Sequence, residues 1–580
     1  MAAKPVTKKL INSVESCVDD NLRGLVAMYP KLRLHPKHRV VTIRNDRDTG
    51  RVAVISGGGS GHEPFASGFI GSGMLDGAIA GGIFASPPTG HVLYAITHLH
   101  KYNSGGSIVI LGNYTGDRLN FGKAIEKAKI AGVKVREVIV AEDIASSHNK
   151  TGGRGLCAEV YLFKLCGAMS AKGYDLDSIH KMALDVCKHM ATLGVCLSPC
   201  SLPGQPPLFE IAQGEMELGA GVHGEAGIAK VTMGTAKEVT ALILEKIVDH
   251  LKLVAGDRVT VMLNNLGGTS ILEVNIMCSE IKDYFSSKKI KSERIFAGHM
   301  KTSLEMHGLH VSVIKLSREN GDFWLELLDG STDAPGWTGT RLSVWEDGQV
   351  GDDDDVLDNY TRKASAGPSL SQSQQELFRG CLQGAGQALV KSESLLNKLD
   401  SGCGDGDCGT TIKQFAQAIL DYIKQGSVEH PSNVLWVLSE IAEKDMGGTS
   451  GGIYSLGLAA ASQSFASSRT VNITAWLAAW ESGMQAITKY GGAEPGDRTM
   501  LDTLHTASVA FKQNLSSDLK TLLRKTGDAA EVGAKATASM TARAGRASYV
   551  ASGYTRDDDA GARAVAIWLQ AIVDFMLSKI

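Results

Sequence analysis

Hydrophobic residues in the first part of the chain occur in short runs that longer stretches of helical period separate. Runs rich in Val and Ile lie at residues 52–55, 107–111, 138–140, 259–263 and 311–314. Strands buried between layers of helices give runs of this kind. The pattern therefore predicts an α/β fold for this part of the chain, and a proline cluster near residue 200 favours a division into two subdomains.

Later in the chain the pattern becomes helical. Hydrophobic positions recur at helical spacing in residues 377–399, 409–423, 434–444 and 562–577, with little alternation of β-branched residues. Between the two patterns lies an acidic stretch followed by Ser, Gly, Pro and Gln, a composition typical of linkers. We predict an α/β domain at 1–345, a linker at 346–375 and an all-α domain at 376–580.

The size and composition of the chain indicate a multidomain globular protein. With 580 residues, 43% hydrophobic and 21% charged, the chain fits neither a disordered protein nor collagen nor a coiled coil. A net charge of -3 and 6% aromatic residues argue against binding of polynucleotides.

The termini and the cysteines bear on the compartment. The first residues contain no apolar segment of a signal peptide, and no uninterrupted apolar run of about 18 residues occurs. The ten cysteines include no C-x-x-C pair, which is typical of reduced thiols. We expect a cytosolic protein with no membrane and no nucleic-acid partner.

Glycine is enriched, and its clusters mark the candidate sites. The chain has 66 glycines, and they gather in tight clusters where backbone can approach a ligand. The first cluster, SGGGSGHEP at 56–64, follows a predicted strand and places His62 at its rim. A flexible turn is the alternative, and a zinc protease is excluded because Ala66 stands where H-E-x-x-H needs histidine.

A carboxylate follows the next predicted strand. Asp117 ends the sequence GNYTGD at 112–117 and should reach the same edge of the sheet as His62. A carboxylate and an imidazole together can move a hydroxyl proton. A helix N-cap is the alternative role for Asp117.

The third cluster, GAGVHGEAG at 219–227, contains His223. It matches G-x-G-x-x-G, but the residues before it are too polar for the strand of a dinucleotide fingerprint. Its H-x-E has no P-C-x-x-C partner, which excludes a zinc deaminase. A neutral imidazole among small residues can add to a carbonyl group, and a purely structural histidine is the alternative.

Three carboxylates lie in the fourth cluster. Asp400, Asp405 and Asp407 fall within DSGCGDGDCGTT at 400–411, where they would repel one another unless a hard cation such as Mg²⁺ lay among them. Thr410 and Ala416 occupy positions where an EF-hand needs glycine and glutamate. A solvated acidic loop is the alternative.

Further glycine-rich segments could complete a nucleotide site. MGGTSGG at 446–452 can open a helix and hold phosphate, and PGDRTM at 495–500 supplies Arg498. GRASY at 545–549 and DDAG at 558–561 are weaker signals. No Walker A motif occurs, so these segments would form a nucleotide site of another design. The alternative is that the segment at 446–452 is a helix start that binds nothing.

In this order, GGGSGHEP, NYTGD, G-x-G-x-H-G-E-A-G, GDGDCGTT, MGGTSG, PGDRTMLD and GRASY resemble the motifs of the dihydroxyacetone kinases, over essentially the whole chain. The resemblance implies an α/β domain that holds a carbonyl substrate and a barrel of antiparallel helices that holds ATP. It implies that His223 forms a covalent hemiaminal with the substrate. His62 and Asp117 would act on the attacking hydroxyl, and Gly59, Ser60, Gly61, His62 and Asp117 would bind the substrate.

The same resemblance assigns the second site. Asp400, Asp405 and Asp407 resemble ligands of a pair of Mg²⁺ ions that bridge the phosphates of ATP. The positions similar to nucleotide contacts of the family are Gly404, Asp405, Gly406, Asp407, Cys408, Gly409, Thr449, Ser450, Lys489, Asp497, Arg498, Asp559, Ala560 and Gly561.

The activities and partners also follow from the resemblance. It implies ATP-dependent phosphorylation of dihydroxyacetone and D-glyceraldehyde by a homodimer. Animal members with this single-chain arrangement also split FAD into AMP and cyclic FMN, with Mn²⁺ or Co²⁺. The alternative is a non-enzymatic sensor that binds a triose or another carbonyl compound, against which the intact aspartate loop argues.

The chain departs from the family pattern at positions near the substrate. Gly112 stands just before NYTGD, where the family usually has a lysine that contacts the substrate. The family's GHEPAHAG is here GHEPFASG, with Phe65 and Ser67. These differences bear on substrate affinity and preference, whereas the hemiaminal histidine and the carboxylates are intact and predict an active kinase.

Overall fold

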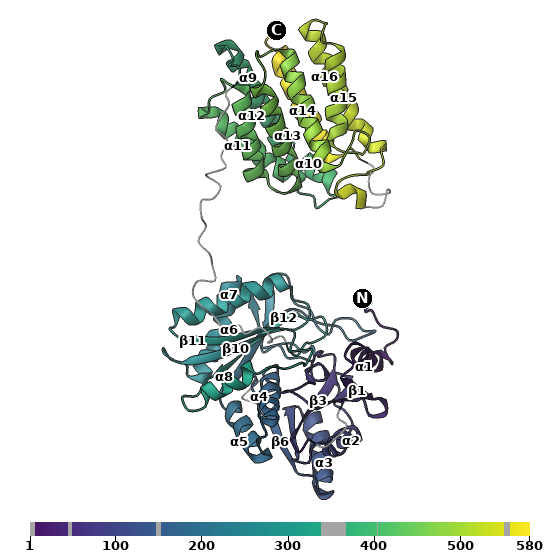
Figure 1. Cartoon of the computed structure of the whole chain (residues 1–580), viewed down its shortest axis with the longest axis vertical. Helices are drawn as coiled ribbons and strands as arrows, with labels where there is room; N and C mark the ends of the chain where they lie inside the picture. The colour runs from purple at the N-terminus through teal and green to yellow at the C-terminus, as the bar shows by residue number, and fades with distance from the viewer. Residues whose placement is uncertain (1–5, 45–48, 147–151, 338–366, 403, 550–556) are drawn as a thin grey trace. The chain divides into compact units, whose positions relative to one another are not determined.

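The structure, a computed structural model, divides into two compact units, residues 1–352 and 353–580 (Figure 1). It describes residues 6–44, 49–146, 152–337, 367–402, 404–549 and 557–580. Most of the predicted linker at 346–375 lies outside these residues. Its last residues belong to helix α9 (Gln372–Lys391), because Ser371 and Gln374 form a capping box that starts the helix.

The first unit contains two six-stranded sheets. The first sheet has the order β1-β2-β4-β3-β5-β6, and its strands β4, β3, β5 and β6 are parallel. Helices α2 and α3 pack on one face, and α4 and α5 pack on the other. The bounds are α1 (Cys17–Met28), β1 (Leu32–His35), β2 (Val40–Ile43), β3 (Ala53–Ser60), β4 (Gly77–Ile83), α2 (Thr89–His100), β5 (Ser107–Gly112), α3 (Thr115–Ile130), β6 (Val135–Val140), α4 (Glu159–Ala171) and α5 (Leu176–Cys187).

The second sheet is mixed, with the order β11-β10-β12-β7-β8-β9 and one parallel pair, β10 with β11, among these strands. It begins at Met190, before the proline cluster near residue 200, because those prolines lie in the loop between β7 and β8. The bounds are β7 (Met190–Ser198), β8 (Glu215–Leu218), β9 (Ala229–Thr232), α6 (Ala236–Leu251), β10 (Arg258–Asn265), α7 (Ile271–Ser287), β11 (Lys291–Gly298), β12 (His307–Lys315) and α8 (Gly321–Asp329).

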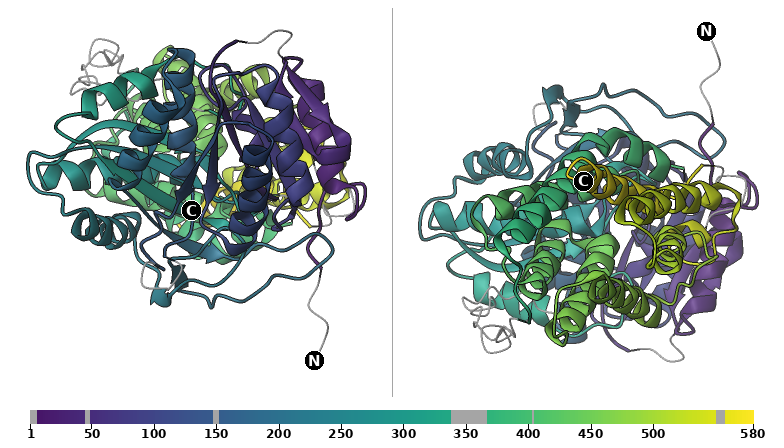
Figure 2. Two further views of the ribbon diagram at one scale, coloured as in Figure 1. Left: turned by 90° about the horizontal axis from the view of Figure 1, so that it is seen from below. Right: turned by 90° about the horizontal axis from the view of Figure 1, so that it is seen from above.

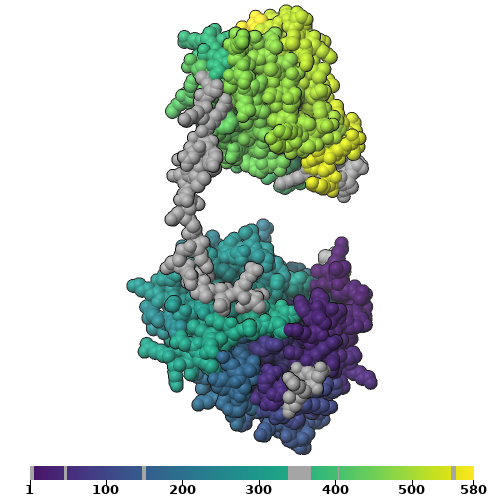
Figure 3. Space-filling model, viewed as in Figure 1, coloured from purple at the N-terminus to yellow at the C-terminus, as the bar shows by residue number. Residues whose placement is uncertain are grey.

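The α/β prediction for this part of the chain is confirmed. All five predicted strands occur, as β3, β5, β6, β10 and β12. The side chains of β3, β5, β10 and β12 are almost completely buried, which explains their continuous hydrophobic runs, whereas β6 exposes Arg136, Glu137 and Ile139. In the space-filling view the first unit, purple to teal, is closely packed (Figure 3).

The described part of the second unit is helical throughout. Neighbouring helices pack in the cyclic order α9, α11, α12, α13, α14, α15, α16, α17 and back to α9, which confirms the predicted helical barrel (Figure 2). The bounds are α9 (Gln372–Lys391), α10 (Glu393–Asp400), α11 (Cys408–Gln425), α12 (Pro431–Ile441), α13 (Gly448–Ala466), α14 (Ile473–Gly491), α15 (Met500–Gln513), α16 (Leu519–Ala536) and α17 (Ala560–Leu577).

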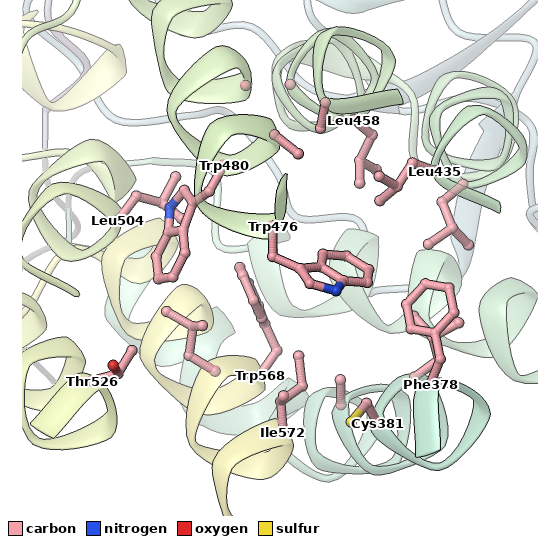
Figure 4. A pocket seen from close by; sticks show the side chains of 18 of the residues that line it. Phe378, Cys381, Leu435, Leu458, Trp476, Trp480, Leu504, Thr526, Trp568 and Ile572 are labelled. Atoms are coloured by element: carbon pink, nitrogen blue, oxygen red, sulfur yellow. The ribbon is translucent and has the colours of Figure 1, made fainter. Parts of the chain in front are cut away.

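The helices of the barrel line an apolar cavity of about 630 Å³. Figure 4 shows Phe378, Trp476, Trp480 and Trp568 around it, contributed by α9, α14 and α17. The helices therefore turn apolar side chains toward the barrel axis, as the helical periods in the sequence predict.

Helix α17 is long and apolar enough to cross a membrane by length and composition alone. Core helices of soluble proteins pass the same test, so this is weak support for a membrane span. In the structure α17 packs against α9 and α16, with Ala562, Val565, Leu569 and Val573 buried. We interpret it as a wall of the barrel.

Candidate active site

The first glycine cluster lies inside a strand. β3 continues to Ser60, whereas the sequence predicts that the strand ends near residue 55. The glycines allow close packing, because a Cβ on Gly57 would lie 2.4 Å from the carbonyl oxygen of Ile79, and one on Gly59 would lie 2.8 Å from the amide of Ala85. The glycines of the cluster therefore permit close strand packing, and their contact with a substrate stays a prediction.

The end of this strand fixes the residues around His62. Gly61 has a φ of 95°, which favours glycine, and its carbonyl accepts from the amide of Leu304. The hydroxyl of Ser60 donates to the carbonyl of Gly81 at 2.9 Å, so its proton is engaged in a hydrogen bond within the fold. The predicted substrate loop is therefore rigid and tied to two other segments.

His62 is buried with a defined tautomer. Its Nδ1 lies 2.8 Å from the carbonyl oxygen of Thr302, so Nδ1 carries the proton and Nε2 keeps a lone pair. Burial, with smaller contributions from His223 and Lys301, holds the pKa of His62 well below its usual value. The ring of Phe84 stacks on it at 5.0 Å between centroids. His62 is therefore a neutral imidazole that can accept a proton at Nε2.

The structure brings His223 next to His62, with 5.0 Å between ring centroids, although 160 residues separate them in sequence. The ring of Tyr114 meets His223 edge-on at 4.7 Å. Burial lowers the pKa of His223 to about 4, an effect that Glu225 opposes and that Lys301 and Arg154 reinforce. His223 therefore carries a neutral imidazole at physiological pH.

A chain of charges positions His223. Its backbone amide donates to Glu225 at 2.8 Å, and Glu225 accepts from Arg154 at 2.9 Å. Arg154 also donates to Asp143 at 2.7 Å and to the carbonyl of Gly219 at 2.7 Å. The sequence gives Glu225 as part of a motif, but it offers no signal for Arg154 or Asp143, because they lie far away along the chain.

Asp117 lies in the first turn of α3 and is buried. The N-cap of that helix is Tyr114, so the alternative role of Asp117 as an N-cap is wrong. Its Oδ1 has no hydrogen-bond partner among the described residues. Burial raises its pKa, while a hydrogen bond from Ser86 and the charge of Lys301 lower it. An unpartnered buried carboxylate oxygen suits contact with a substrate hydroxyl.

The aspartate loop of the second unit joins α10 to α11. Carboxylate oxygens of Asp400, Asp405 and Asp407 lie within 4.8 Å of one another. Asp400 is fixed by the backbone amides of Gly406, Asp407 and Cys408, which donate to its Oδ2 at 2.9, 3.2 and 3.4 Å. Three oxygen donors in this arrangement fit a hard cation such as Mg²⁺.

Asp559 and Arg498 lie beside this loop. Asp559 caps α17 by accepting from the amide of Ala562, and its pKa is raised to about 6, mainly by burial. Arg498 is almost fully buried, and its Nη1 lies 3.8 Å from Asp559. Its Nε and Nη1 have no hydrogen-bond partner among the described residues. A buried guanidinium with such donors suits a phosphate group.

Other predicted nucleotide residues lie at helix starts. Thr449 and Ser450 are in the first turn of α13, after Gly447 with a φ of 60°, and Ala560 and Gly561 open α17. Backbone amides in such turns can bind phosphate. The segment Ala442–Met446 before α13 packs on α11, the helix that follows the aspartate loop.

Lys489 and Asp497, which the sequence also predicts at the nucleotide site, do not lie at the start of a helix. The ammonium of Lys489, in the last turn of α14, lies 4.8 Å from the centroid of the Tyr490 ring. Within the described ranges no ion pair joins it to the aspartate loop. Asp497 accepts from the amide of Glu494 at 2.8 Å and so shapes its own turn. The structure brings Arg498 within 3.8 Å of Asp559, and the role of Lys489 at the nucleotide site stays a prediction.

Comparison with protein families matches both units. The Dak1 domain matches residues 23–336, and the DAK2 domain matches residues 402–574. His62 and His223 lie within the Dak1 match, and Asp405, Asp407, Arg498 and Asp559 lie within the DAK2 match, which begins just after Asp400.

Relatives match over nearly the full length. The triokinase/FMN cyclase of Homo sapiens is 40% identical, covering 99% of this chain and 100% of the relative. Dihydroxyacetone kinase 1 of Saccharomyces cerevisiae is 31% identical, covering 96% and 97%. The crystal structure of the dihydroxyacetone kinase from C. freundii in complex with AMP-PNP and Mg²⁺ is 30% identical with a TM-score of 0.69, covering 98% and 100%.

Proposed function

The chain belongs to the Dak1–DAK2 family, which includes dihydroxyacetone kinases and triokinase/FMN cyclases, and we propose that it phosphorylates dihydroxyacetone and D-glyceraldehyde with ATP. The single observation that carries the proposal is the pairing of two buried, neutral imidazoles, His62 and His223, with ring centroids 5.0 Å apart. The aspartate loop in the same chain supplies the second site that a kinase needs.

The carbonyl site would hold its substrate covalently. A ring nitrogen of His223 adds its lone pair to the carbonyl carbon as the C=O π bond breaks, and the oxygen becomes a hydroxyl group by taking up the proton that the other ring nitrogen releases, which leaves the ring neutral. A small triose offers little surface to bind, so this reversible bond selects it over glycerol, which has no carbonyl. Glu225 and Arg154 hold the backbone of His223 in place for this addition.

Proton removal from the attacking hydroxyl falls to His62 and Asp117. Because Nδ1 of His62 donates to Thr302, the free lone pair on Nε2 can accept the hydroxyl proton as the oxygen attacks the γ-phosphorus. The unpartnered Oδ1 of Asp117 can accept a hydrogen bond from the same substrate.

The second site would bind ATP. Asp400, Asp405 and Asp407 would hold Mg²⁺, which neutralises phosphate charge and orients the γ-phosphate when bound. Arg498 adds a buried positive charge, and the first turns of α13 and α17 offer backbone amides. Positioning and charge are what phosphoryl transfer needs most.

A phosphorylation assay tests the kinase proposal. Wild type and Asp405→Ala are incubated with ATP, Mg²⁺ and dihydroxyacetone, and triose phosphate is measured. Loss of one carboxylate from the loop should lower activity by about a hundredfold, because an incomplete ligand set binds the cation weakly. Full activity of Asp405→Ala would contradict the assignment of the loop, and a wild type that transfers no phosphate would contradict the function.

We also propose the cleavage of FAD into AMP and cyclic FMN at the nucleotide site. The 40% identity to a triokinase/FMN cyclase over the whole chain supports this activity. The AMP half of FAD matches the adenosine and phosphate groups of ATP, so Asp400, Asp405 and Asp407 would serve both reactions, with Mn²⁺ or Co²⁺ for the cleavage.

Variants of the two sites distinguish the activities. With Mn²⁺ and FAD, His223→Ala should keep its cyclic FMN production, because the reaction needs no carbonyl substrate, whereas Asp405→Ala should lose it. Chromatography of the flavin products measures both. Loss of cleavage in His223→Ala would show that the two reactions do not separate in this way.

We further propose that the protein acts in the cytosol as a homodimer, as the family resemblance implies. Size-exclusion chromatography with light scattering measures the oligomeric state. The sensor alternative gains no support from the relatives named above, which are kinases over both domains.

A further inference from the structure

A lysine that the sequence analysis does not single out lies in the carbonyl site. The side chain of Lys301, in the segment after β11, is 4% exposed. Its ammonium donates to Glu159 at 2.9 Å and to the carbonyl of Gly155 at 3.2 Å, and it lies 4.2 Å from the centroid of the Phe65 ring. Burying an ammonium costs free energy unless the charge is paired, and here the carboxylate of Glu159 pairs it.

The backbone of Lys301 is fixed as well. Its amide donates to the side-chain oxygen of Asn264 at 3.0 Å, and its carbonyl accepts from the same side chain at 2.8 Å. The next residue, Thr302, provides the carbonyl that bonds to His62. Lys301 and Thr302 are therefore adjacent residues of one fixed segment, in which Lys301 supplies the ammonium and the carbonyl of Thr302 sets the tautomer of His62.

The charge of Lys301 reaches the reacting groups. It contributes to lowering the pKa of His62, His223 and Asp117, although burial is the largest influence on each. The ammonium also lies 5.6 Å from the ring centroid of Tyr114, which contacts His223 edge-on. Lys301 is thus a positive charge at the point where these side chains meet.

The surroundings of Lys301 include two of the departures from the family pattern. A Cβ on Gly112 would lie 2.3 Å from Oε1 of Glu159, the oxygen that accepts from Lys301. A side chain at 112 is therefore incompatible with the present position of Glu159. Phe65, the second departure, provides the ring beneath the ammonium. Gly112, Phe65 and Lys301 form one coupled arrangement.

We propose that Lys301 is the substrate-binding cation of the carbonyl site and takes the role that the family resemblance gives to a lysine at position 112. This rests on the proposed function. An ammonium has three N–H donors, and protein oxygens among the described residues accept two of them. The third donates to an oxygen of dihydroxyacetone, while Glu159 positions the ammonium.

Kinetics of a small set of variants test the proposal. Lys301→Met removes the ammonium, and Lys301→Met/Glu159→Gln removes it without leaving a lone buried carboxylate. Gly112→Lys/Glu159→Ala/Lys301→Met moves the lysine to the family position and removes the Glu159 side chain, with which a side chain at 112 is incompatible. Lys164→Met is the matched control, because Lys164 is equally buried in α4 but donates to the carbonyl of Leu327.

The measured quantities are KM for dihydroxyacetone, KM for ATP, and the ¹³C signal of [2-¹³C]dihydroxyacetone, which reports the hemiaminal. Loss of a hydrogen bond from a charged donor should raise KM for dihydroxyacetone about tenfold or more in both Lys301 variants. KM for ATP should stay unchanged. The transferred lysine in Gly112→Lys/Glu159→Ala/Lys301→Met should recover part of the affinity, and Lys164→Met should match wild type.

Three outcomes would overturn the proposal. The first is an unchanged KM for dihydroxyacetone in a folded Lys301 variant, and the second is an equal rise of both KM values, which would indicate a structural role. The third is a transferred lysine that binds substrate no better than Lys301→Met. A wild type with neither hemiaminal nor phosphorylation would refute the proposed function itself, and this role with it.

Discussion

Burial controls the protonation of both imidazoles in the carbonyl site. His62 and His223 lose solvation of their charged forms, and the ammonium of Lys301 disfavours a second positive charge nearby. A histidine in water would be partly protonated near neutral pH. In this site both rings remain neutral, so one can act as nucleophile and the other as base.

The pKa of His223 gives a prediction for substrate binding. Only the neutral ring can add to a carbonyl, and with a pKa of about 4 it stays neutral well below the usual value of 6.5. Hemiaminal formation without ATP should therefore be nearly the same at about pH 5.5 as at neutral pH, and should decline only toward pH 4. The ¹³C signal of labelled dihydroxyacetone measures this, and a midpoint near pH 6.5 would contradict the assignment.

The lowered pKa of His223 also makes the stability of the fold depend on pH. Between about pH 4 and 6.5 the unfolded chain binds a proton at His223 that the folded chain does not, so the free energy of unfolding falls as pH decreases through this window. His310, buried with a pKa lowered to about 4 mainly by burial, acts in the same direction.

At the residue scale, sequence motifs identified the candidate reacting side chains but not the charged residues around them. His62, His223 and Asp117 stand in glycine-rich motifs with recognisable spacing. Lys301, Glu159 and Arg154 stand in ordinary sequence, and only the fold brings them to the site. Their contribution is the charge of the pocket, which depends on distances that no local pattern encodes.

At the element scale, glycines have different roles in the two sites. Those of β3 permit close packing of strand on strand, since a side chain at Gly57 would collide with β4. Those of the aspartate loop let the chain turn tightly around the carboxylate of Asp400, because Gly406 has a φ of 76°. Composition alone could not distinguish these roles, because both appear as clusters of small residues.

Gly404 gives a prediction for the loop. A Cβ there would lie 2.3 Å from Oδ1 of Asp400, so Gly404→Ala should displace this carboxylate. We expect the Mg²⁺ concentration for half-maximal kinase activity to rise about tenfold or more, with little change in melting temperature. Titration of activity with Mg²⁺ measures the effect.

Gly122→Ala is the matched control for this variant. Gly122 lies within α3, where an added Cβ meets no atom within 4 Å and φ is ordinary. The substitution should leave Mg²⁺ activation unchanged and raise stability by about 0.5–1 kcal/mol. Equal Mg²⁺ requirements in Gly404→Ala and this control would show that Asp400 is not a ligand.

At the scale of the whole molecule, the chain carries the parts of one reaction in two units. The first unit holds the groups that we propose act on a carbonyl and a hydroxyl, and the second holds groups that fit a metal and phosphates. The sequence predicted this division because hydrophobic periodicity changes near residue 376. It placed the start of the helical unit slightly late, because the capping box at Ser371 lies within a stretch of linker-like composition.

The central claim is that His223 holds a carbonyl substrate for phosphoryl transfer from ATP. It is tested most directly by measuring ATP-dependent phosphorylation of dihydroxyacetone and of glycerol, side by side, with wild type and His223→Ala. Wild type should phosphorylate dihydroxyacetone but not glycerol, and His223→Ala should lose this activity. Phosphorylation of both compounds by wild type, or full activity of His223→Ala, would contradict it.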